Sequence, residues 1–359
     1  MRLKLKDIGY KNWRHYLQLN KWYDKTQLLS YKAFLNLLIG NRGVGKTFGF
    51  KCWCIDDYKK TGHQFVWLRR FGTEIELMKK SFFDDIASKY PDDKFDVKGS
   101  KKSGIFYCNG EICGYYFALS TSSIAKSSSY PMVDKIIYDE FLIVGNTYKY
   151  LSDEVVLLLE LIDTIFRDRE TRPNAVKPRG VYLLGNNITI ANPYFLYFNI
   201  PQMKSRFYYD KERGLLVEMY KNEVFIEEKK TTRFGKLIQG TAYYDYNVEN
   251  IAMLDNNKFI RKRPTHCNFH CAIDYKGNTF GFWFDYKNGE MYVSKQYDPD
   301  TYARYALTKD DHNINLYLIK NCNSTAIKTI IWLFRAGCLF FEDMQIKAQC
   351  YEMLSFFIR

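Results

Sequence analysis

The most informative feature of the sequence is a glycine-rich segment between positions 40 and 47. It reads GNRGVGKT, which fits the pattern G-x-x-x-x-G-K-[S/T] of loops that bind the phosphates of a nucleotide. Glycines let backbone N–H groups curl around phosphate oxygens, and the dipole of a following helix favours negative charge. In such loops the lysine reaches the β- and γ-phosphates of ATP, and the following hydroxyl binds Mg²⁺. The predicted nucleotide-binding residues are Gly40, Asn41, Arg42, Gly43, Val44, Gly45, Lys46 and Thr47, with Thr47 also a metal ligand.

A second feature, about 90 residues downstream, supplies the acids that nucleotide hydrolysis requires. The apolar run Ile136–Tyr138 is followed directly by Asp139 and Glu140. At the end of a buried strand, Asp139 can hold Mg²⁺ through water, and Glu140 can orient and polarise the attacking water. GTPases and small-molecule kinases usually lack the second acid. The pair therefore favours an ATP-driven motor or a helicase-like ATPase.

Three further polar residues are candidates for catalysis. Arg167, in the segment FRDRE, follows an apolar helical stretch and could reach the γ-phosphate of a neighbouring subunit, or it could be a salt-bridged helix end. Asn186 comes just after an apolar strand and could sense the γ-phosphate, although asparagine is also common in turns. Lys126 lies in a polar serine-rich loop, where it is either a cation acting on a neighbouring subunit or a solvated lysine.

The elements that must position these residues follow an alternating pattern. Four apolar runs of strand length precede helical or turn segments, and Asn109-Gly110 is a strong hairpin signal between two shorter runs. Strands that alternate with helices predict βαβ units, a mostly parallel sheet and ligands at the carboxyl ends of the strands. The predicted strands are 33–39, 64–68, 135–138 and 180–185, the hairpin spans 106–108 and 112–119, and the predicted helices are 47–60, 73–89 and 155–166.

The pattern changes after about residue 210. Residues 224–230 are helix-like, and short alternating strands then appear from about residue 256. These strands are expected at 268–273, 279–284 and 291–296, followed by helices at 323–336 and 341–357. We therefore expect a P-loop domain over 1–225, including an N-terminal extension over 1–27, then a helical linker over 226–255 and an α+β domain over 256–359.

Composition narrows the class of partner. The formal net charge is +13, of which residues 1–210 carry +10, from 32 basic and 22 acidic side chains. Aromatic residues make up 18% of the chain. A basic, aromatic-rich protein suggests an acidic partner, with nucleic acid first and a membrane surface second. The apolar runs are too short to span a membrane, and nine scattered cysteines do not suggest a disulfide framework. We therefore expect a reduced, intracellular protein.

Several segments together resemble the DNA-packaging ATPase of phi29-like phages. The resemblance implies an additional-strand P-loop ATPase domain with a mostly parallel sheet, a small helical linker and an RNase H-like C-terminal domain without nuclease activity. It is strongest through residue 195, and the first 20 or so residues have no counterpart in it. It is carried by residues 28–31, 39–47, 65–70, 129–131, 139–141, 161–170, 192–195, 232–235 and 281–285.

The resemblance also implies an assembly and roles for single residues. It implies a homopentameric ring at the portal vertex of an empty prohead in the host cytoplasm, with a structural RNA and double-stranded DNA as partners. Lys46 and Thr47 match its phosphate-binding pair, and Asp139 and Glu140 match its metal-coordinating and catalytic acids. Arg167 matches a trans-acting arginine finger, Lys126 a second trans-acting cation, and Asn186 the polar residue of the sensor strand.

One departure and two alternatives remain. Phe71-Gly72-Thr73 stands where the family carries a lysine before a proline, and Arg69 and Arg70 are the candidates to substitute for that lysine.

Candidate contacts to DNA phosphates are Lys98, Lys101 and Lys102 in the loop 97–104, with Arg261-Lys262-Arg263 as a second set. The alternatives are a DNA helicase or conjugation-type translocase, and a nucleotide-gated assembly factor that binds nucleic acid without hydrolysis.

Overall fold

The computed structural model describes residues 22–143, 150–186, 192–201, 203, 205–241, 244, 258–319 and 324–354. Most of the predicted N-terminal extension, residues 1–21, lies outside the described residues. The same holds for residues 245–255 of the predicted linker. No helix in the described part of the chain combines the length and the apolar character needed to cross a membrane.

The chain divides into two compact units. The P-loop unit comprises Met1–Thr189 and Pro201–Leu254, and the C-terminal unit comprises Ile190–Ile200 and Asp255–Arg359. The main division therefore falls at residues 254 and 255, next to the predicted start of the C-terminal domain at residue 256.

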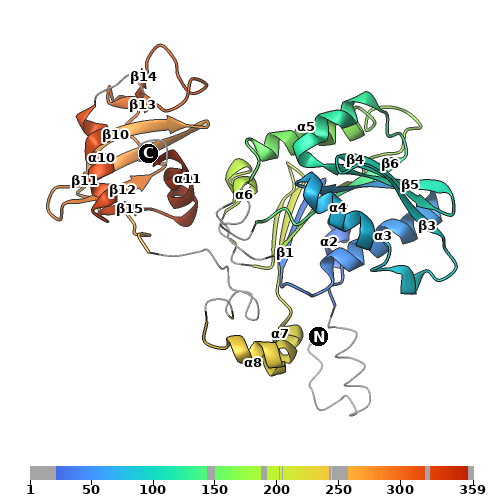
Figure 1. Cartoon of the computed structure of the whole chain (residues 1–359). Helices are drawn as coiled ribbons and strands as arrows, with labels where there is room; N and C mark the ends of the chain where they lie inside the picture. Colours follow the sequence, from blue (N-terminus) through green and yellow to red (C-terminus); the bar gives the residue numbers. More distant parts are fainter. Residues whose placement is uncertain are drawn as a thin grey trace. The chain divides into compact units, whose positions relative to one another are not determined.

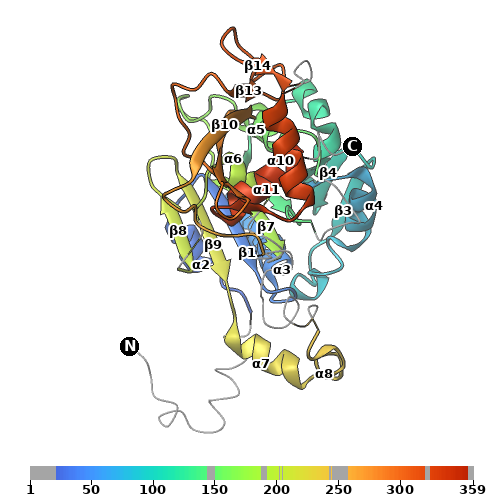
Figure 2. The ribbon, with the colours of Figure 1, turned by 90° about the vertical axis from the view of Figure 1, so that its left-hand side faces the viewer.

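A nine-stranded sheet forms the centre of the P-loop unit. Its strands are β1 (Leu35–Gly40), β2 (Gln64–Arg69), β3 (Phe95–Gly99), β4 (Ser103–Cys108), β5 (Glu111–Ala118), β6 (Val133–Asp139), β7 (Gly180–Asn186), β8 (Phe207–Asp210) and β9 (Leu215–Tyr220). In space their order is β3-β4-β5-β2-β6-β7-β1-β9-β8. The six central strands, β5, β2, β6, β7, β1 and β9 in spatial order, run parallel to one another (Figures 1 and 2). Strands β3 and β4 at one edge and β8 at the other pair antiparallel.

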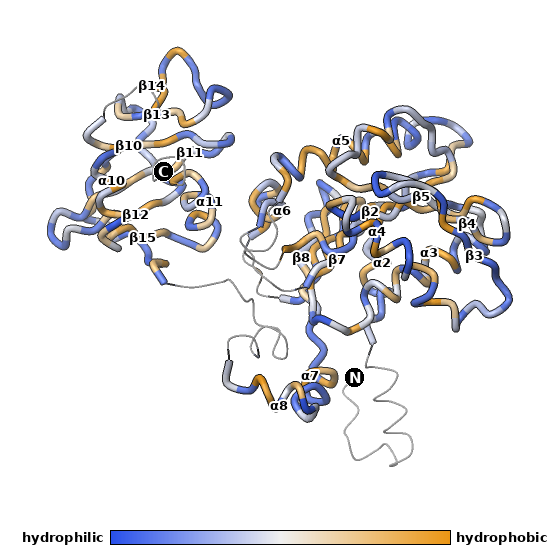
Figure 3. The backbone as a smooth tube through the Cα atoms, viewed as in Figure 1, coloured by the Kyte–Doolittle hydropathy of each residue, from blue (hydrophilic) through white to orange (hydrophobic). Residues whose placement is uncertain are grey.

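The strand order identifies the type of P-loop fold. Strand β7 lies between β1, which leads into the glycine-rich loop, and β6, which ends in Asp139. This is the additional strand that the resemblance implies. The predicted α/β fold with a mostly parallel sheet is therefore confirmed, and the apolar runs that predicted it form the buried centre of the sheet (Figure 3).

Helices cover both faces of this sheet. The helices of the unit are α2 (Thr26–Ser30), α3 (Lys46–Thr61), α4 (Gly72–Ser81), α5 (Glu154–Phe166), α7 (Glu223–Thr231) and α8 (Arg233–Ile238), with 3-10 helices η2 (Ala87–Lys89) and η3 (Leu119–Ser127). Of these, α7 and α8 lie beyond the end of the sheet in Figure 1 and do not cover a face. Phe50 and Ile55 of α3 and Ile75 of α4 share one hydrophobic core with Trp67 and Ile137 of the sheet. Helix α5 contributes none of the residues of that core and lies on the other side of the sheet in Figure 1.

Three local predictions in this unit were wrong or incomplete. The helix predicted over 73–89 ends at Ser81 and is followed by turns and the 3-10 helix η2, while Phe82 and Phe83 pack on Phe106 of β4. The serine-rich segment around Lys126 is not a loop but part of the 3-10 helix η3. Lys98 lies on the edge strand β3 rather than in a loop, and strands β8 and β9 were missed altogether.

The C-terminal unit contains a six-stranded mixed sheet. Its strands are β10 (Asn268–Tyr275), β11 (Asn278–Asp285), β12 (Glu290–Ser294), β13 (Arg304–Ala306), β14 (Tyr317–Leu318) and β15 (Leu339–Phe341). The order is β14-β13-β10-β11-β12-β15, with an antiparallel meander from β10 to β12 and parallel pairs outside it. Helices α10 (Thr325–Arg335) and α11 (Met344–Leu354) pack on this sheet, and the short helix α6 (Pro193–Tyr197) belongs to the same unit.

Candidate active site

The glycine-rich loop joins β1 to α3 through a backbone that requires glycine. Gly43 and Gly45 have φ angles of +90° and +81°, in the left-handed region that glycine adopts without strain. Gly40 is needed for a different reason, because a Cβ atom there would lie 2.7 Å from the carbonyl oxygen of Tyr220 on β9. Among the described residues, no side chain caps the start of α3, so its first amides remain available to a phosphate.

Lys46 is the buried cation of this loop. Its Nζ donates hydrogen bonds to the carbonyl oxygens of Gly40 and Asn41, at 3.0 and 2.7 Å, and to Oδ1 of Asn186 at 3.2 Å. Burial lowers the pKa of Lys46 to about 7, although the charge of Asp139 opposes the shift. A desolvated ammonium group held by neutral oxygens gains from an incoming anion. The contact with Asn186 joins the loop to the end of β7.

The two acids lie at the end of β6 and share one arginine. Thr47 Oγ1 donates to Asp139 Oδ1 at 2.9 Å. Arg69, at the end of the adjacent strand β2, contacts Asp139 Oδ2 through Nη1 and Glu140 Oε2 through Nη2, each at 3.2 Å. Burial raises the pKa of Asp139, and the positive charge of Arg69 opposes this effect. The side chain of Glu140 is 60% exposed, and its φ of +59° is uncommon outside glycine.

A cavity of about 440 Å³ joins the loop and the acids. This volume lies in the range of small-molecule binding sites. The predicted residues that line it are Arg42, Gly43, Gly45, Lys46, Thr47, Asp139, Glu140 and Asn186. Asn41 and Val44 are instead buried behind the loop, with exposed fractions of 1% and 0%. Most of the predicted nucleotide-binding and catalytic residues therefore surround one cavity.

The two predicted trans-acting cations lie together, away from this cavity. Arg167 ends α5 with a φ of +47°, is exposed, and donates through Nη2 to the carbonyl oxygen of Ser128 at 3.3 Å. Lys126, two residues before Ser128, pairs with exposed Glu160 at 3.3 Å. Arg169 is different, because its buried guanidinium group donates to the carbonyl oxygens of Pro131, Val133, Ile165, Phe166 and Val176. Of the two arginines in the FRDRE segment, Arg167 therefore presents its charge at the surface, whereas Arg169 is structural.

The structure adds residues to the site that the sequence did not assign. The bridging position of Arg69 was not predicted, although its place in the chain before Phe71 had made it a candidate for the missing lysine. Tyr23 N donates to the carbonyl oxygen of Val44 at 2.9 Å, and Asn222 N donates to Asn41 Oδ1 at 3.0 Å. Asn222 could have been found as a helix-starting asparagine before residue 223, but nothing in the sequence places it against the loop.

Comparisons with known proteins extend the resemblance to nearly the whole chain. A family model described as podovirus DNA encapsidation protein (Gp16) matches residues 17–357. The DNA packaging proteins of Bacillus phages PZA and phi29 are 37% and 36% identical over 335 residues, which is 92% of this chain and 96% of each relative. The solved bacteriophage phi29 viral genome packaging motor assembly contains a similar chain, with a TM-score of 0.75 and 34% identity over 93% of this chain and 99% of that one.

Proposed function

Because the chain belongs to the podovirus DNA encapsidation family, we propose that it is an ATP-driven motor that moves double-stranded viral DNA into a preformed prohead. The observation that carries the proposal is the single cavity shared by the phosphate-binding loop, Asp139, Glu140 and Asn186. A loop of this kind beside two acids is the arrangement that ATP hydrolysis requires. The motor would act as a homomeric ring, as the resemblance implies.

The residues of the cavity fit ATP with Mg²⁺. The hydroxyl of Thr47 and the carboxylate of Asp139 offer two oxygen atoms 2.9 Å apart, and oxygen is the ligand that Mg²⁺ prefers. When bound, Mg²⁺ would neutralise charge on the β- and γ-phosphate oxygens. Thr47 and Asp139 are the residues that would hold the ion.

The other cavity residues take separate parts in hydrolysis. Lys46 would bind the β- and γ-phosphates, and the carboxylate of Glu140 would orient the attacking water and accept its proton. Asn186, already in contact with Lys46, would sense the γ-phosphate. Arg69 would hold the carboxylate of Glu140 in place through its 3.2 Å contact.

Arg167 and Lys126 would complete the site of a neighbouring subunit. Both are exposed, and neither lines the cavity of its own chain. An arginine that reaches the γ-phosphate in trans stabilises charge in the transition state, typically by 10³- to 10⁵-fold in rate. Mixing Arg167→Ala with Glu140→Gln subunits tests this role. We expect mixed rings to regain part of the ATPase activity, because a subunit that keeps Glu140 beside one that keeps Arg167 has a complete site, and absence of any recovery would contradict a trans role.

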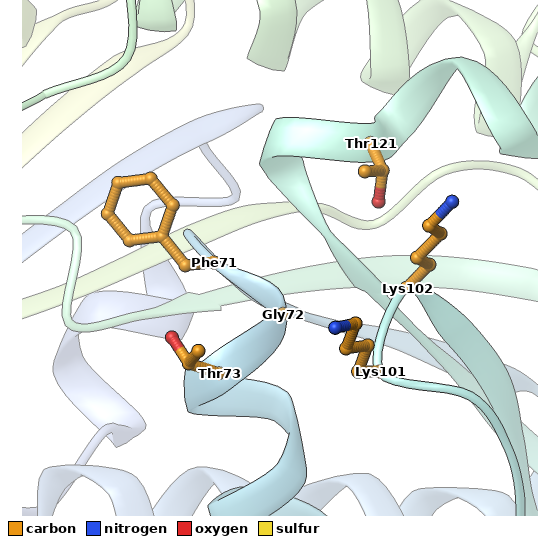
Figure 4. Close-up of a pocket in the computed structure, with 6 residues that line it drawn as sticks. All are labelled: Phe71, Gly72, Thr73, Lys101, Lys102 and Thr121. Atoms are coloured by element: carbon orange, nitrogen blue, oxygen red, sulfur yellow. The ribbon is translucent and has the colours of Figure 1, made fainter.

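DNA contacts are best placed at the turn between β3 and β4. Lys101 and Lys102 line a second cavity, of about 430 Å³, together with the start of α4 and Thr121 (Figure 4). This is also where Phe71-Gly72-Thr73 departs from the family pattern. In the second candidate set, Arg261 is already paired with Glu290 through both carboxylate oxygens. Exposed lysines that contact phosphates give sequence-independent binding, which packaging of a whole genome requires.

The C-terminal unit would be the RNase H-like domain that the resemblance implies. Its antiparallel meander flanked by parallel strands supports this assignment. Asp274 and Asp285, at the ends of β10 and β11, are the acids best placed to hold a nuclease metal, and both have partners within the unit. Asp274 pairs with Arg304 at 2.9 Å, and Asp285 accepts hydrogen bonds from Lys287 N and Asn288 at the β11–β12 turn. These contacts support a domain without nuclease activity.

The remaining partners follow from the family likeness. We propose that the ring is pentameric and works in the host cytoplasm, at the portal vertex of the prohead, with a structural RNA as scaffold. The decisive experiment is the ATPase rate measured with and without double-stranded DNA and empty proheads. We expect stimulation when both are present. An ATPase indifferent to DNA would overturn the proposal, strand separation would favour a helicase, and absence of turnover would favour an assembly factor.

A further inference from the structure

Helix α7 lies against the outer side of the phosphate-binding loop, although the sequence assigned most of it to the linker. The helix follows β9 directly in the chain (Figure 2). Asn222, just before the helix, hydrogen-bonds to Asn41, and Lys229 hydrogen-bonds to Arg42. The ring of Phe225 lies beside Gly43. One face of α7 therefore follows the loop from its second to its fourth residue.

The contact at Asn222 is buried and fixes both elements at once. Its backbone N–H donates to Asn41 Oδ1 at 3.0 Å, while its own Oδ1 accepts the N–H of Phe225 at 3.0 Å and so caps α7. Asn41 and Asn222 are only 1% and 6% exposed. A buried polar pair of this kind is costly to break, because each group would be left without its partner. The start of α7 is thus tied to the loop.

Phe225 restricts the loop sterically. A Cβ atom on Gly43 would lie 3.3 Å from Cζ of Phe225, so the ring sits directly against the glycine. Gly43 also lines the nucleotide cavity, and Phe225 is not among the residues that line it. The ring therefore limits how far the Gly43 backbone can move away from a phosphate in the cavity.

Lys229 acts on the peptide bond between Arg42 and Gly43. Its Nζ donates to the carbonyl oxygen of Arg42 at 3.2 Å. In a trans peptide the C=O and the following N–H point in opposite directions. A cation on the Arg42 carbonyl therefore favours the orientation in which the Gly43 N–H points to the opposite side, and it strengthens that N–H as a donor.

The electrostatics of Lys229 also place its ammonium group close to the phosphate-binding loop. Burial lowers the pKa of Lys229, and the nearby charge of Arg42 adds to the shift. The charge of Lys229 also contributes to the lowered pKa of Lys46. Arg42 and Lys46 of the loop and Lys229 of α7 therefore place three positive charges close together. Their mutual repulsion and desolvation cost free energy, and a bound polyphosphate would reduce this cost.

We propose that α7 is part of the nucleotide site, with Lys229 as a positioning residue that holds the Arg42–Gly43 peptide for the phosphates of a nucleotide. The proposal rests on the proposed function, since it concerns the same cavity. Its consequence is reciprocal: if α7 favours the nucleotide-binding form of the loop, bound nucleotide must stabilise α7 by the same free energy.

The first test compares Lys229→Met with Lys230→Met. Lys230 is the adjacent lysine of the same helix and pairs with Glu227 at 2.9 Å, so it is a matched control. We expect Lys229→Met to raise KM for ATP by about 10- to 100-fold, the range for a hydrogen bond to a charged group, with kcat unchanged. Lys230→Met should behave like wild type, and Lys229→Arg should restore KM. Equal KM values for the two methionine variants would overturn the proposal.

The second test separates positioning from folding. Hydrogen exchange of α7 is measured in the full chain with and without a non-hydrolysable ATP analogue. Wild type should show protection of α7 on binding, and Lys229→Met should lose it while its melting temperature stays the same. If Lys229→Met lowered both kcat and the melting temperature, Lys229 would have only a structural role, and the proposal would be overturned. Failure of the wild type to bind the analogue would instead overturn the proposed function.

Discussion

Strand β6 carries charged residues at both of its ends, and the two ends are built in opposite ways. At its start, Lys135 is fully buried and pairs with Asp57 and Asp134 at 2.7 and 2.5 Å, while Arg179 pairs with the same two acids at 2.8 and 2.9 Å. At its C-terminal end, Asp139 and the exposed Glu140 both pair with Arg69. The first end is a closed network, whereas the second opens onto a cavity.

The open end also keeps polar atoms without partners. Arg69 Nε and Asn41 Nδ2 are buried, and neither has a hydrogen-bond partner among the described residues. Burying such groups costs free energy, so this end of the strand is less fully satisfied than the other. The comparison teaches that charge at one end of the strand stabilises the fold, while charge at the other end is held ready for a nucleotide.

The closed end could be mistaken for a metal site. Asp57, His63 and Asp134 place one ligand atom each within 4.8 Å of one another, a spacing that could hold an ion. Lys135 and Arg179 already neutralise the two carboxylates, however, and a metal ion would have to displace both cations. The network is therefore better explained as a structural ion cluster, which the predictions below test against the open end.

The largest effect is expected from Glu140→Gln at the open end. Loss of the general base should lower kcat for ATP by about 10²- to 10⁴-fold, while the melting temperature stays near that of wild type, because this carboxylate is exposed. Steady-state ATPase rates and thermal unfolding measure the two quantities. Glu76→Gln, which removes an exposed acid of α4 paired with Lys79, is the control. Packaging of DNA by the Glu140→Gln variant would contradict the assignment.

The open end was largely predictable from the sequence, because its signals are local. The loop needs its glycines at Gly43 and Gly45 for backbone reasons, and the acids must follow an apolar strand. Arg69 was harder, because its contact with the acids depends on β2 lying beside β6. The position of α7 could not be predicted either, since it depends on β9, a strand whose pairing with β1 joins residues about 180 apart in the chain.

The closed end was not predicted at all, for a related reason. Asp57 lies on α3, Lys135 on β6, and Arg179 just before β7, so no short segment contains the network. A lysine within an apolar run gives no sign of which acids will neutralise it. The end of the helix predicted over 73–89 was wrong for a similar reason. Phe82 packs on Trp67 of β2 and Phe106 of β4, and these contacts with distant strands cannot be read from the local helical pattern.

Lys135→Met should have the next largest effect, but on stability. Removing one partner of a buried ion cluster leaves uncompensated charge, which costs about 3–5 kcal/mol of folding free energy. The kcat of the molecules that remain folded should not change. Denaturant unfolding and the ATPase rate per folded molecule measure both, with Lys89→Met as an exposed-lysine control that should stay close to wild type. If Lys135→Met instead lowered kcat strongly without lowering stability, the start of β6 would act in catalysis, and the two ends of the strand would not differ as proposed.

Thr47→Val sharpens the metal assignment at the open end. The substitution removes the hydroxyl that contacts Asp139 while it keeps the shape of the side chain. We expect the Mg²⁺ concentration for half-maximal ATPase to rise by about 10- to 100-fold, as for other changes around a metal site. Thr61→Val, at the opposite end of the same helix, is the control. An unchanged Mg²⁺ dependence would exclude Thr47 from the metal site.

The smallest effect is expected from Asp57→Asn, and it depends on pH. Burial would raise the pKa of Asp57, but hydrogen bonds from Arg179 and Lys135 and their charges outweigh it, so the pKa is lowered. A carboxyl with a lowered pKa in the folded state adds stability above its unfolded pKa of 3.8 and loses it as the pH falls through the folded value. Asp57→Asn should therefore cost only about 1 kcal/mol at neutral pH, because Asp134 still pairs with both Lys135 and Arg179. The difference from wild type should narrow below about pH 4 in urea unfolding. Asp56→Asn, at the neighbouring acid that pairs with exposed Lys89, is the control, and a gap independent of pH would show that Asp57 contributes no charge to the network.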